Sequence, residues 1–333
     1  MKPLDPIFDA VESFFTDYLK LTRGCSQCTL ASYRDTLRLL FEYVSQHRKI
    51  TIDRLCLSDF DVDLILEFLE HLERERHNSV STRNCRLAAL RSFFAHVLRR
   101  HPEHAGCLAR ILALRPKRHS PAPPRYLEPP TVQSLLRNPN RDTSAGRRDY
   151  ALILFLFNTG ARVSEAIRVQ RKDLLPGPAV LLHGKGKKTR VSPLWPETAA
   201  AIKAQSVQAS TDSEQAIFQN ARAHALSRHG VYHILMHHAA AVHQRDSSVP
   251  AKVYPHLLRH SCGAALLQAG ADLVTIRDQL GHVSVATTGR YATSNLKLKR
   301  AALEAFWEIT GMSAPKHNRW RPAPKLLQFL HSI

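Results

Sequence analysis

The chain has 333 residues, of which 44% are hydrophobic, so it is long enough to form two domains with a core in each. Its 47 Lys and Arg outnumber its 28 Asp and Glu, and the formal net charge of +19 indicates a polyanionic partner. No apolar run approaches the roughly 18 residues of a membrane span, and no apolar signal core follows Met1-Lys2-Pro3. We therefore expect a cytoplasmic protein with no membrane partner.

The cysteines do not form a framework of paired spacings. Cys25 and Cys28 make a single C-x-x-C pair, and no second pair accompanies it to complete a zinc site. Reduced thiols without a metal are therefore expected. The six cysteines are Cys25, Cys28, Cys56, Cys85, Cys107 and Cys262.

Residues 1–114 are predicted to form an all-helical domain. Apolar residues recur at spacings of three and four over 30–44, 60–72 and 87–98, which places them on one face of each helix. Arginines flank the last face, either as a solvated helix surface or as contacts to nucleic acid, and periodicity does not choose between these. They are Arg83, Arg86, Arg91, Arg99 and Arg100.

The segment 115–128, RPKRHSPAPPRYLE, is predicted to be a linker between two domains. Its prolines prevent a continuous helix and favour an extended chain of some stiffness. Lys117, Arg118 and Arg125 make it basic. A basic extended connector is suited to follow a nucleic-acid backbone while the two domains clamp the duplex.

The second domain is predicted over 129–312 as a mixed α/β domain. It has an apolar helix over 150–157 and two short strands over 179–183 and 189–194. Glycines on both sides of Lys185 allow a sharp turn between the strands. The fold class expected for the whole chain is therefore mainly α, with a small β-hairpin or sheet in the second of two domains.

A histidine-rich helix is predicted over 225–242. Its histidines invite a metal-site interpretation, but zinc sites use one closed set of ligands with supporting groups, and no such set is identifiable here. A solvated helix close to DNA is the preferred interpretation. The histidines are His229, His233, His237, His238 and, just beyond, His243.

The stretch 254–291 carries four side chains suited to attack on a phosphodiester. His256 and Arg259 are three residues apart, one turn of a helix, so both can face one point. His282 follows a glycine, and Tyr291 comes nine residues later. An arginine can neutralise the phosphate, histidines can move protons, and a tyrosine can act as nucleophile. Taken singly, each of these residues is more often part of a helix surface or a core.

Further motifs upstream change the interpretation of this stretch. T-G-A-R-V-S-E ends at Glu165, Lys185 lies in the predicted hairpin, H-L-L-R-H begins at His256, L-G-H-V-S contains His282, and T-T precedes Tyr291. Together these motifs resemble, in order and spacing, the signature of the tyrosine recombinases of the phage integrase family. The resemblance covers both predicted domains, and it implies a helical core-binding (SAM-like) domain followed by a catalytic integrase domain.

The resemblance assigns roles to the cationic residues. Arg162 and Arg259 match the two arginines that hold the non-bridging oxygens of the scissile phosphate, for which a planar guanidinium is better suited than an ammonium group. Lys185 matches the hairpin lysine that donates a proton to the leaving 5′-oxygen. Glu165, three residues after Arg162, is interpreted as a support for that arginine.

The remaining site residues follow in the same way. His256 matches the position that assists proton transfer, and His282 the position that hydrogen-bonds the phosphate. Tyr291 matches the nucleophile, which leaves a 3′-phosphotyrosyl bond. His260 is interpreted as structural. Where many relatives have an acidic residue after the first histidine of H-x-L-R-H, this chain has Leu257, which puts in doubt only an interaction behind the site.

The implied function is that of a site-specific DNA recombinase or integrase, in the integration or excision of a mobile element. The reaction needs no cofactor and no metal, and the implied partners are double-stranded DNA recombination sites and a homo- or hetero-tetramer of recombinases. The alternatives are resolution of chromosome or plasmid dimers, a type IB topoisomerase-like enzyme, and a catalytically silent DNA-binding protein. Residues 313–333 form an apolar-ended tail that either docks on a neighbouring protomer or packs on its own domain.

Overall fold

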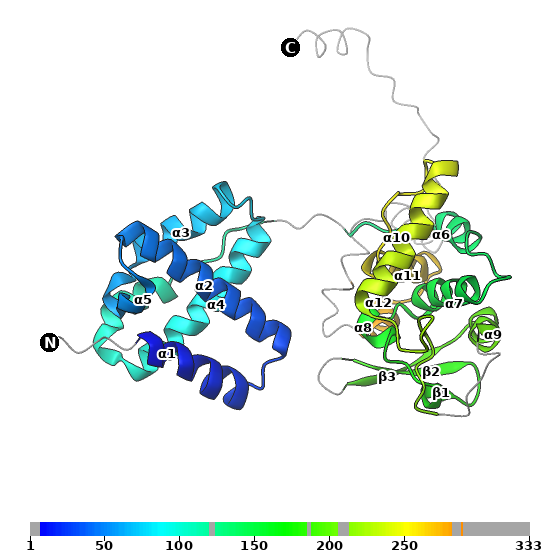
Figure 1. Cartoon of the computed structure of the whole chain (residues 1–333), viewed down its shortest axis with the longest axis horizontal. Coiled ribbons are helices and arrows are strands. Elements are labelled where there is room, and N and C mark those ends of the chain that lie inside the picture. The colour runs from blue at the N-terminus through cyan, green and yellow to red at the C-terminus, as the bar shows by residue number, and fades with distance from the viewer. Residues whose placement is uncertain (1–6, 120–123, 185–187, 206–212, 282–287, 289–333) are drawn as a thin grey trace, which may run out of the picture. The chain divides into compact units, whose positions relative to one another are not determined.

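The structure is a computed structural model, and it describes residues 7–119, 124–184, 188–205, 213–281 and 288. The chain divides near residue 121 into two compact units (Figure 1). Each unit has its own hydrophobic core. The expected fold class, mainly α with a small sheet, is confirmed.

In its described part the first unit consists of helices. Its three longest helices begin at side chains that accept a hydrogen bond from the first turn, namely Ser26, Asp61 and Ser79. The elements are α1 (Ile7–Ser13), the π-helical η1 (Phe14–Thr22), α2 (Gln27–Arg48), α3 (Val62–Arg74), α4 (Val80–Arg100) and α5 (Ala105–Leu112). Short 3₁₀ turns occur at η2 (Ile52–Arg54), η3 (Leu57–Asp59) and η4 (Pro102–His104).

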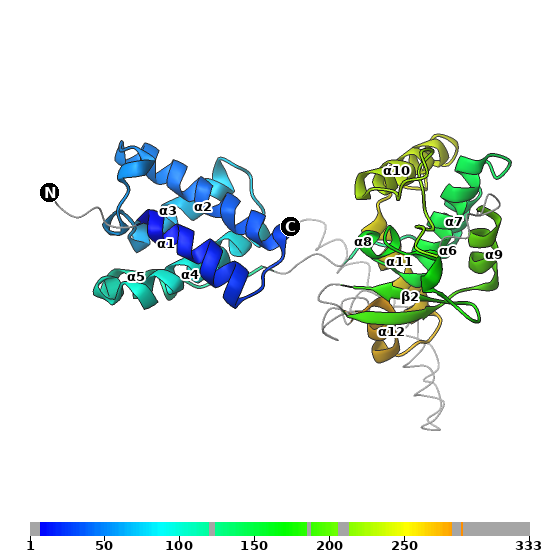
Figure 2. The same ribbon diagram turned by 60° about the horizontal axis from the view of Figure 1, so that its bottom comes forward.

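Aromatic side chains fill the core of the first unit. Phe14, Phe60, Phe93 and Phe94 have no exposed surface, and the rings of Phe14 and Phe93 meet edge-on with centroids 5.3 Å apart. Phe14 belongs to η1, Phe93 and Phe94 belong to α4, and Phe60 lies between η3 and α3. Helix α2 packs on α4 in the same unit (Figure 2). The periodic apolar faces predicted from the sequence are therefore the faces that form this core.

The two ends of the linker are anchored, each to its own unit. The Asn84 side chain on α4 accepts a hydrogen bond from the Lys117 backbone N–H at 3.0 Å and donates one to its carbonyl at 2.8 Å. At the other end, the Leu127 N–H donates to Ser261 Oγ at 2.8 Å, and Leu127 joins the core of the second unit. Both described ends of the predicted linker are therefore held by hydrogen bonds to the unit that each adjoins.

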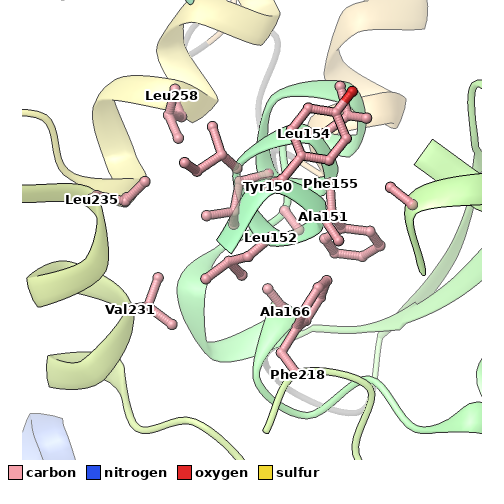
Figure 3. Packing of buried hydrophobic residues seen from close by; sticks show 14 of the residues in the cluster. Tyr150, Ala151, Leu152, Leu154, Phe155, Ala166, Phe218, Val231, Leu235 and Leu258 are labelled. Carbon is pink, nitrogen blue, oxygen red and sulfur yellow. The ribbon is translucent and has the colours of Figure 1, made fainter. Parts of the chain in front are cut away.

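The second unit is built around α7 (Ser144–Thr159), whose residues 150–156 are all buried. Leu152 and Phe155 of this helix face apolar side chains of α10, α11 and Phe218 (Figure 3). The other helices are α6 (Pro129–Leu136), α8 (Val163–Ala166), α9 (Pro196–Gln205), α10 (Arg228–Arg245), α11 (Pro255–Gln268) and α12 (Leu273–Leu280), with a 3₁₀ turn at η5 (Arg171–Asp173). Because α7 lies in the middle of this unit, its C-terminal end is a fixed point for the segment that follows.

A three-stranded antiparallel sheet lies at one side of the second unit. Its strands are β1 (Leu174–Leu175), β2 (Ala179–His183) and β3 (Thr189–Pro193), in the order β1-β2-β3. The predicted hairpin corresponds to β2 and β3, with Val180 opposite Ser192. β1 was not predicted, because two leucines are too short to show alternation. α12 packs against β3.

The histidine-rich helix α10 differs in part from the expectation of a solvated helix. His238 is buried, with Nε2 3.0 Å from Asp149 Oδ2 of α7 and Nδ1 2.7 Å from the amide of Asn138. This histidine therefore joins α10 to α7, whereas His229, His233 and His237 are exposed. No group of three or more metal-ligating side chains is found among the described residues.

Within the described residues, no helix is both long and apolar enough to cross a membrane.

Candidate active site

The turn after α7 needs a glycine. Gly160 has φ +58°, in the left-handed region, and a Cβ atom there would lie 2.3 Å from Leu280 Cδ2 and 3.2 Å from Cys262 Sγ. Its carbonyl oxygen accepts a hydrogen bond from Arg259 Nη1 at 2.6 Å. The T-G pair therefore brings the end of α7 against both α11 and α12, and Arg162 follows two residues later.

Arg162 stands at the start of the short helix α8. Its backbone N–H donates to Glu165 Oε2 at 2.9 Å, and its Nη1 donates to Glu165 Oε1 at 2.8 Å. Its Nη2 donates to the carbonyl oxygen of Gly281 at 3.1 Å. The side chain is 38% exposed, so Arg162 is oriented by two protein groups and still reaches the surface.

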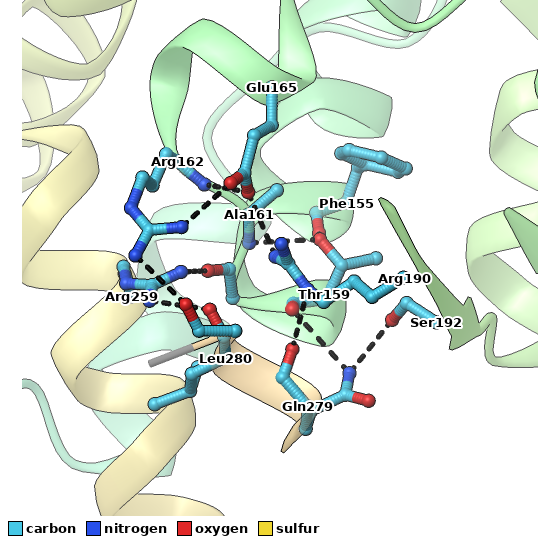
Figure 4. A network of polar contacts seen from close by, with 12 residues as sticks. Phe155, Thr159, Ala161, Arg162, Glu165, Arg190, Ser192, Arg259, Gln279 and Leu280 are labelled. Atoms are coloured by element: carbon cyan, nitrogen blue, oxygen red, sulfur yellow. Dashed lines mark hydrogen bonds and ion pairs between the residues drawn. The ribbon is translucent and has the colours of Figure 1, made fainter. Parts of the chain in front are cut away.

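Arg259 lies on α11 and is 1% exposed. Its Nη1 donates to Gly160 O and its Nη2 to Leu280 O, both at 2.6 Å. A buried guanidinium is tolerated only when its donors are satisfied. These two carbonyls fix the plane of the guanidinium beside that of Arg162 (Figure 4).

A third guanidinium completes the cluster. Arg190 of β3 donates from Nε to Gln279 O at 3.0 Å and from Nη2 to Glu165 Oε2 at 2.8 Å. Arg190, Arg259 and Arg162 therefore donate to the three consecutive carbonyls of residues 279–281. These carbonyls are at the C-terminal end of α12, where a helix has unsatisfied acceptors and partial negative charge, so three cations are stabilised there.

Glu165 is the carboxylate that contacts two of these arginines, and it is 2% exposed. Burial by itself raises the pKa of Glu165, but the hydrogen bond and charge of Arg190, followed by the hydrogen bonds from Arg162, outweigh burial and lower it. Glu165 is therefore ionised at neutral pH. One negative charge against three guanidiniums leaves a site suited to an anion.

His256 lies in the first turn of α11, one turn before Arg259. Its ring meets that of His260 edge-on, with centroids 4.3 Å apart. Partial burial of the ring, followed by the positive charges of Arg259 and Arg162, lowers its pKa. The imidazole is therefore neutral at pH 7 and can accept a proton.

Two family models match the chain. The model of the phage integrase family matches residues 125–297, and the model of the phage integrase N-terminal SAM-like domain matches residues 13–101. The chain belongs to the phage integrase family. It is a tyrosine recombinase, an enzyme that breaks and rejoins DNA strands, as the sequence motifs predicted.

Curated relatives resemble this recombinase over most of their length. The integrase/recombinase y4rC of Sinorhizobium fredii is 37% identical over 326 residues, which is 97% of each chain. The tyrosine recombinase XerD of Mycobacterium tuberculosis H37Rv is 34% identical over 292 residues, 83% of this chain and 90% of the relative.

Solved structures share the fold at lower identity. The Tn1549 transposon integrase, solved with transposon right end DNA, superposes with a TM-score of 0.70 at 14% identity and covers 90% of this chain and 99% of that one. The XerH recombinase bound to difH in a post-cleavage complex gives a TM-score of 0.67 at 22% identity, covering 90% and 88% of the two chains.

Of the predicted site residues of the integrase, Arg162, His256 and Arg259 are described, and the structure brings them together. Lys185, His282 and Tyr291 lie outside the described residues. Their described neighbours adjoin the arginine cluster. The Gly184 N–H donates to Lys188 O at 2.7 Å, and a Cβ at Gly184 would lie 3.5 Å from Glu165 Oε1.

Arg190 is the member of the cluster that sequence reasoning missed. An arginine on a short strand resembles a solvated residue, but β3 alternates, and Arg190 and Ser192 are its two less exposed positions between exposed neighbours. The sequence carries no signal of this alternation, because Val191, the apolar residue between Arg190 and Ser192, is exposed. Leu257, the departure from the usual motif, is 5% exposed and belongs to the hydrophobic core.

Proposed function

We propose that this recombinase cuts and rejoins double-stranded DNA at specific sites by means of Tyr291. The phenol oxygen attacks the scissile phosphorus, the P–O5′ bond breaks, and the 5′-oxygen takes up a proton from Lys185. The product is a 3′-phosphotyrosyl bond and a free 5′-hydroxyl. A 5′-hydroxyl from a partner strand then attacks the phosphotyrosine, which rejoins DNA and frees Tyr291.

The arrangement of Arg162 and Arg259 is the observation that carries this proposal. Their guanidiniums are held side by side by adjacent carbonyls, those of Gly281 and Leu280. A five-coordinate phosphorus concentrates negative charge on its non-bridging oxygens, and preorganised planar donors stabilise that charge without reorganisation. These two arginines would hold the phosphate, and His282, next to Gly281, would donate a further hydrogen bond.

The lowered pKa of His256 supports its assignment to proton transfer. A phenol has an ordinary pKa of about 10 and is mostly protonated at neutral pH, so it needs a base or a strongly cationic site to react. His256 is neutral at pH 7 and lies one turn from Arg259. It is therefore able to accept the phenol proton as the bond to phosphorus forms.

Integration or excision of a mobile element is the biological role that the relatives favour. The relative named integrase/recombinase shares 37% identity over 97% of both chains, against 34% over 83% of this chain for XerD. Dimer resolution of chromosomes or plasmids is the second candidate, which the XerD likeness supports. In either role, the partners would be duplex recombination sites and a tetramer of recombinases in the cytoplasm.

Suicide substrates test the reaction and the role together. Nicked duplexes built from the flanks of the gene trap the covalent intermediate, because the short 5′ product diffuses away. An adduct on these flanks supports a mobile-element role. An adduct only on duplexes from chromosomal or plasmid resolution sites supports dimer resolution, and no adduct on any of them contradicts the proposed activity.

A further inference from the structure

Arg190 lies where three parts of the site meet. It belongs to β3, which begins four residues after Lys185 in the sequence. Its guanidinium contacts Glu165, which orients Arg162, and the carbonyl of Gln279 at the end of α12. One side chain therefore joins three segments: β3, the turn that carries Arg162, and the end of α12, which precedes His282 in the sequence.

A second contact on the same strand reinforces this junction. Ser192 is fully buried, and its Oγ accepts a hydrogen bond from Gln279 Nε2 at 2.8 Å. The two inward positions of β3, Arg190 and Ser192, thus both bind Gln279 (Figure 4). The end of α12 is attached to the hairpin by a backbone acceptor and by a side chain.

Gly281, the residue before His282, lies against the side chain of Arg190 and leaves little room there for a Cβ atom. Gly281 has φ +62°, and a Cβ atom there would lie 3.0 Å from Arg190 Nη1 and 3.3 Å from Arg190 Cδ. The guanidinium therefore lies directly against this turn. The Arg190 side chain is 12% exposed, and its Nε and Nη2 atoms both donate to protein acceptors, Gln279 O and Glu165 Oε2.

We propose that Arg190 is a positioning residue of the strand-cleavage reaction, which sets the hairpin of Lys185 relative to Arg162 and the turn of His282. The inference rests on the proposed function. It requires the planar guanidinium, because Nε and Nη2 serve acceptors on two different segments. A lysine keeps the charge but cannot serve both acceptors in this geometry.

Single-turnover cleavage by Arg190→Lys tests the proposal. At saturating DNA we expect the rate to fall about a hundredfold, the effect of a misplacement of roughly 1 Å, with the dissociation constant for DNA within about twofold of wild type. Arg168→Lys, an exposed arginine in the same unit, is the matched control and should cleave like wild type. Cleavage by Arg190→Lys at the wild-type rate would overturn the proposal.

A substrate with a bridging sulfur shows whether the lost rate comes from the hairpin. A 5′-bridging phosphorothiolate breaks its P–S bond and releases a thiolate, which needs no proton from Lys185. If Arg190 places that lysine, Arg190→Lys should recover a large part of the lost rate on the sulfur substrate. Equal losses on the oxygen and sulfur substrates would overturn the hairpin part of the proposal.

Amide hydrogen exchange gives a readout that does not depend on cleavage. In Arg190→Lys, the amides of Gly184 and Gly281 should exchange faster than in wild type, while α7 stays protected as in Arg168→Lys. Unchanged exchange at both glycines would overturn the coupling. If the wild-type protein forms no Tyr291 adduct, the proposed function fails, and the exchange measurement still decides whether Arg190 joins the two segments.

Discussion

Arg162 and Arg259 donate to adjacent carbonyl oxygens, those of Gly281 and Leu280, at 3.1 and 2.6 Å. Two guanidiniums that are 97 positions apart in the chain (259 − 162) are thus held together by the backbone at the end of one helix. Their mutual repulsion is offset by those carbonyls and by Glu165. The geometry of the proposed phosphate site therefore depends on these backbone carbonyls and on Glu165.

Replacing Gly160 with alanine tests this dependence on the backbone. The new Cβ would lie 2.3 Å from Leu280 Cδ2, at a residue with φ +58°, so the end of α7 must move away from α12. We expect Gly160→Ala to lower the free energy of unfolding by about 2–3 kcal/mol and to reduce cleavage. Chemical denaturation measures the first effect.

Gly177→Ala is the control for Gly160→Ala. Gly177 also has a positive φ, +85°, but a Cβ there meets nothing within 4 Å. The Gly177→Ala variant has the backbone strain but no steric clash, so it should lower the free energy of unfolding by about 1 kcal/mol. Equal losses for the two variants would contradict the close approach of Gly160 and Leu280.

The pH dependence of the free energy of unfolding should show the contribution of the Glu165 carboxylate. Its pKa is lowered on folding from an ordinary value of 4.5, so it stabilises the fold above that value, and this stability is lost as the pH falls through the lower folded pKa. Glu165→Gln leaves the guanidiniums of Arg162 and Arg190 without their carboxylate partner and should lower the free energy of unfolding by about 3 kcal/mol at pH 7. Denaturation series from pH 7 to pH 3 should show the difference between wild type and variant shrinking below about pH 4.5. A difference that grows on acidification would contradict the assignment.

His256 should titrate below the ordinary histidine value of about 6.5. Partial burial and then the charges of Arg259 and Arg162 lower its pKa, and NMR of the imidazole Cε1–H measures it in the free enzyme. Arg162→Met removes one of the charges and should move the pKa part of the way back, because burial and Arg259 remain. A value at or above 6.5 in the wild type would contradict the neutral imidazole.

The Arg162→Lys variant tests whether cleavage needs the planar guanidinium of Arg162 or only its positive charge. An ammonium group keeps the charge but cannot donate to Glu165 and Gly281 while also presenting a donor pair to a phosphate. Cleavage should fall by about a hundredfold or more, as for the loss of one oxyanion donor, with little change in DNA affinity. Comparable losses in binding and cleavage would show instead that Arg162 serves mainly to bind DNA.

The sequence predicted the elements that have clear periodicity. The apolar faces around Leu40, Phe68 and Phe94 are local patterns, as are the two short runs on either side of the glycines next to Lys185. The structure contains the corresponding helices and strands. The prediction of α7 covered only its apolar part, because its first turns over 144–149 are polar and depend on Thr143 as N-cap.

Contacts between distant segments could not be predicted in this way. Nothing local shows that Arg190 reaches Gln279, 89 positions later, or that His238 is buried against Asp149. The motifs of Arg162, His256 and Arg259 identified the site because they could be compared with a family. The support that Arg190 gives to Glu165 became visible only in the folded chain.

The covalent adduct tests the central claim most directly. Wild-type protein incubated with a labelled suicide duplex should give a protein–DNA band on a denaturing gel, and mass spectrometry of the digested band should place the phosphate on Tyr291. Tyr291→Phe should bind the same duplex and give no band. An adduct that survives in Tyr291→Phe, or one mapped to another residue, would contradict the account.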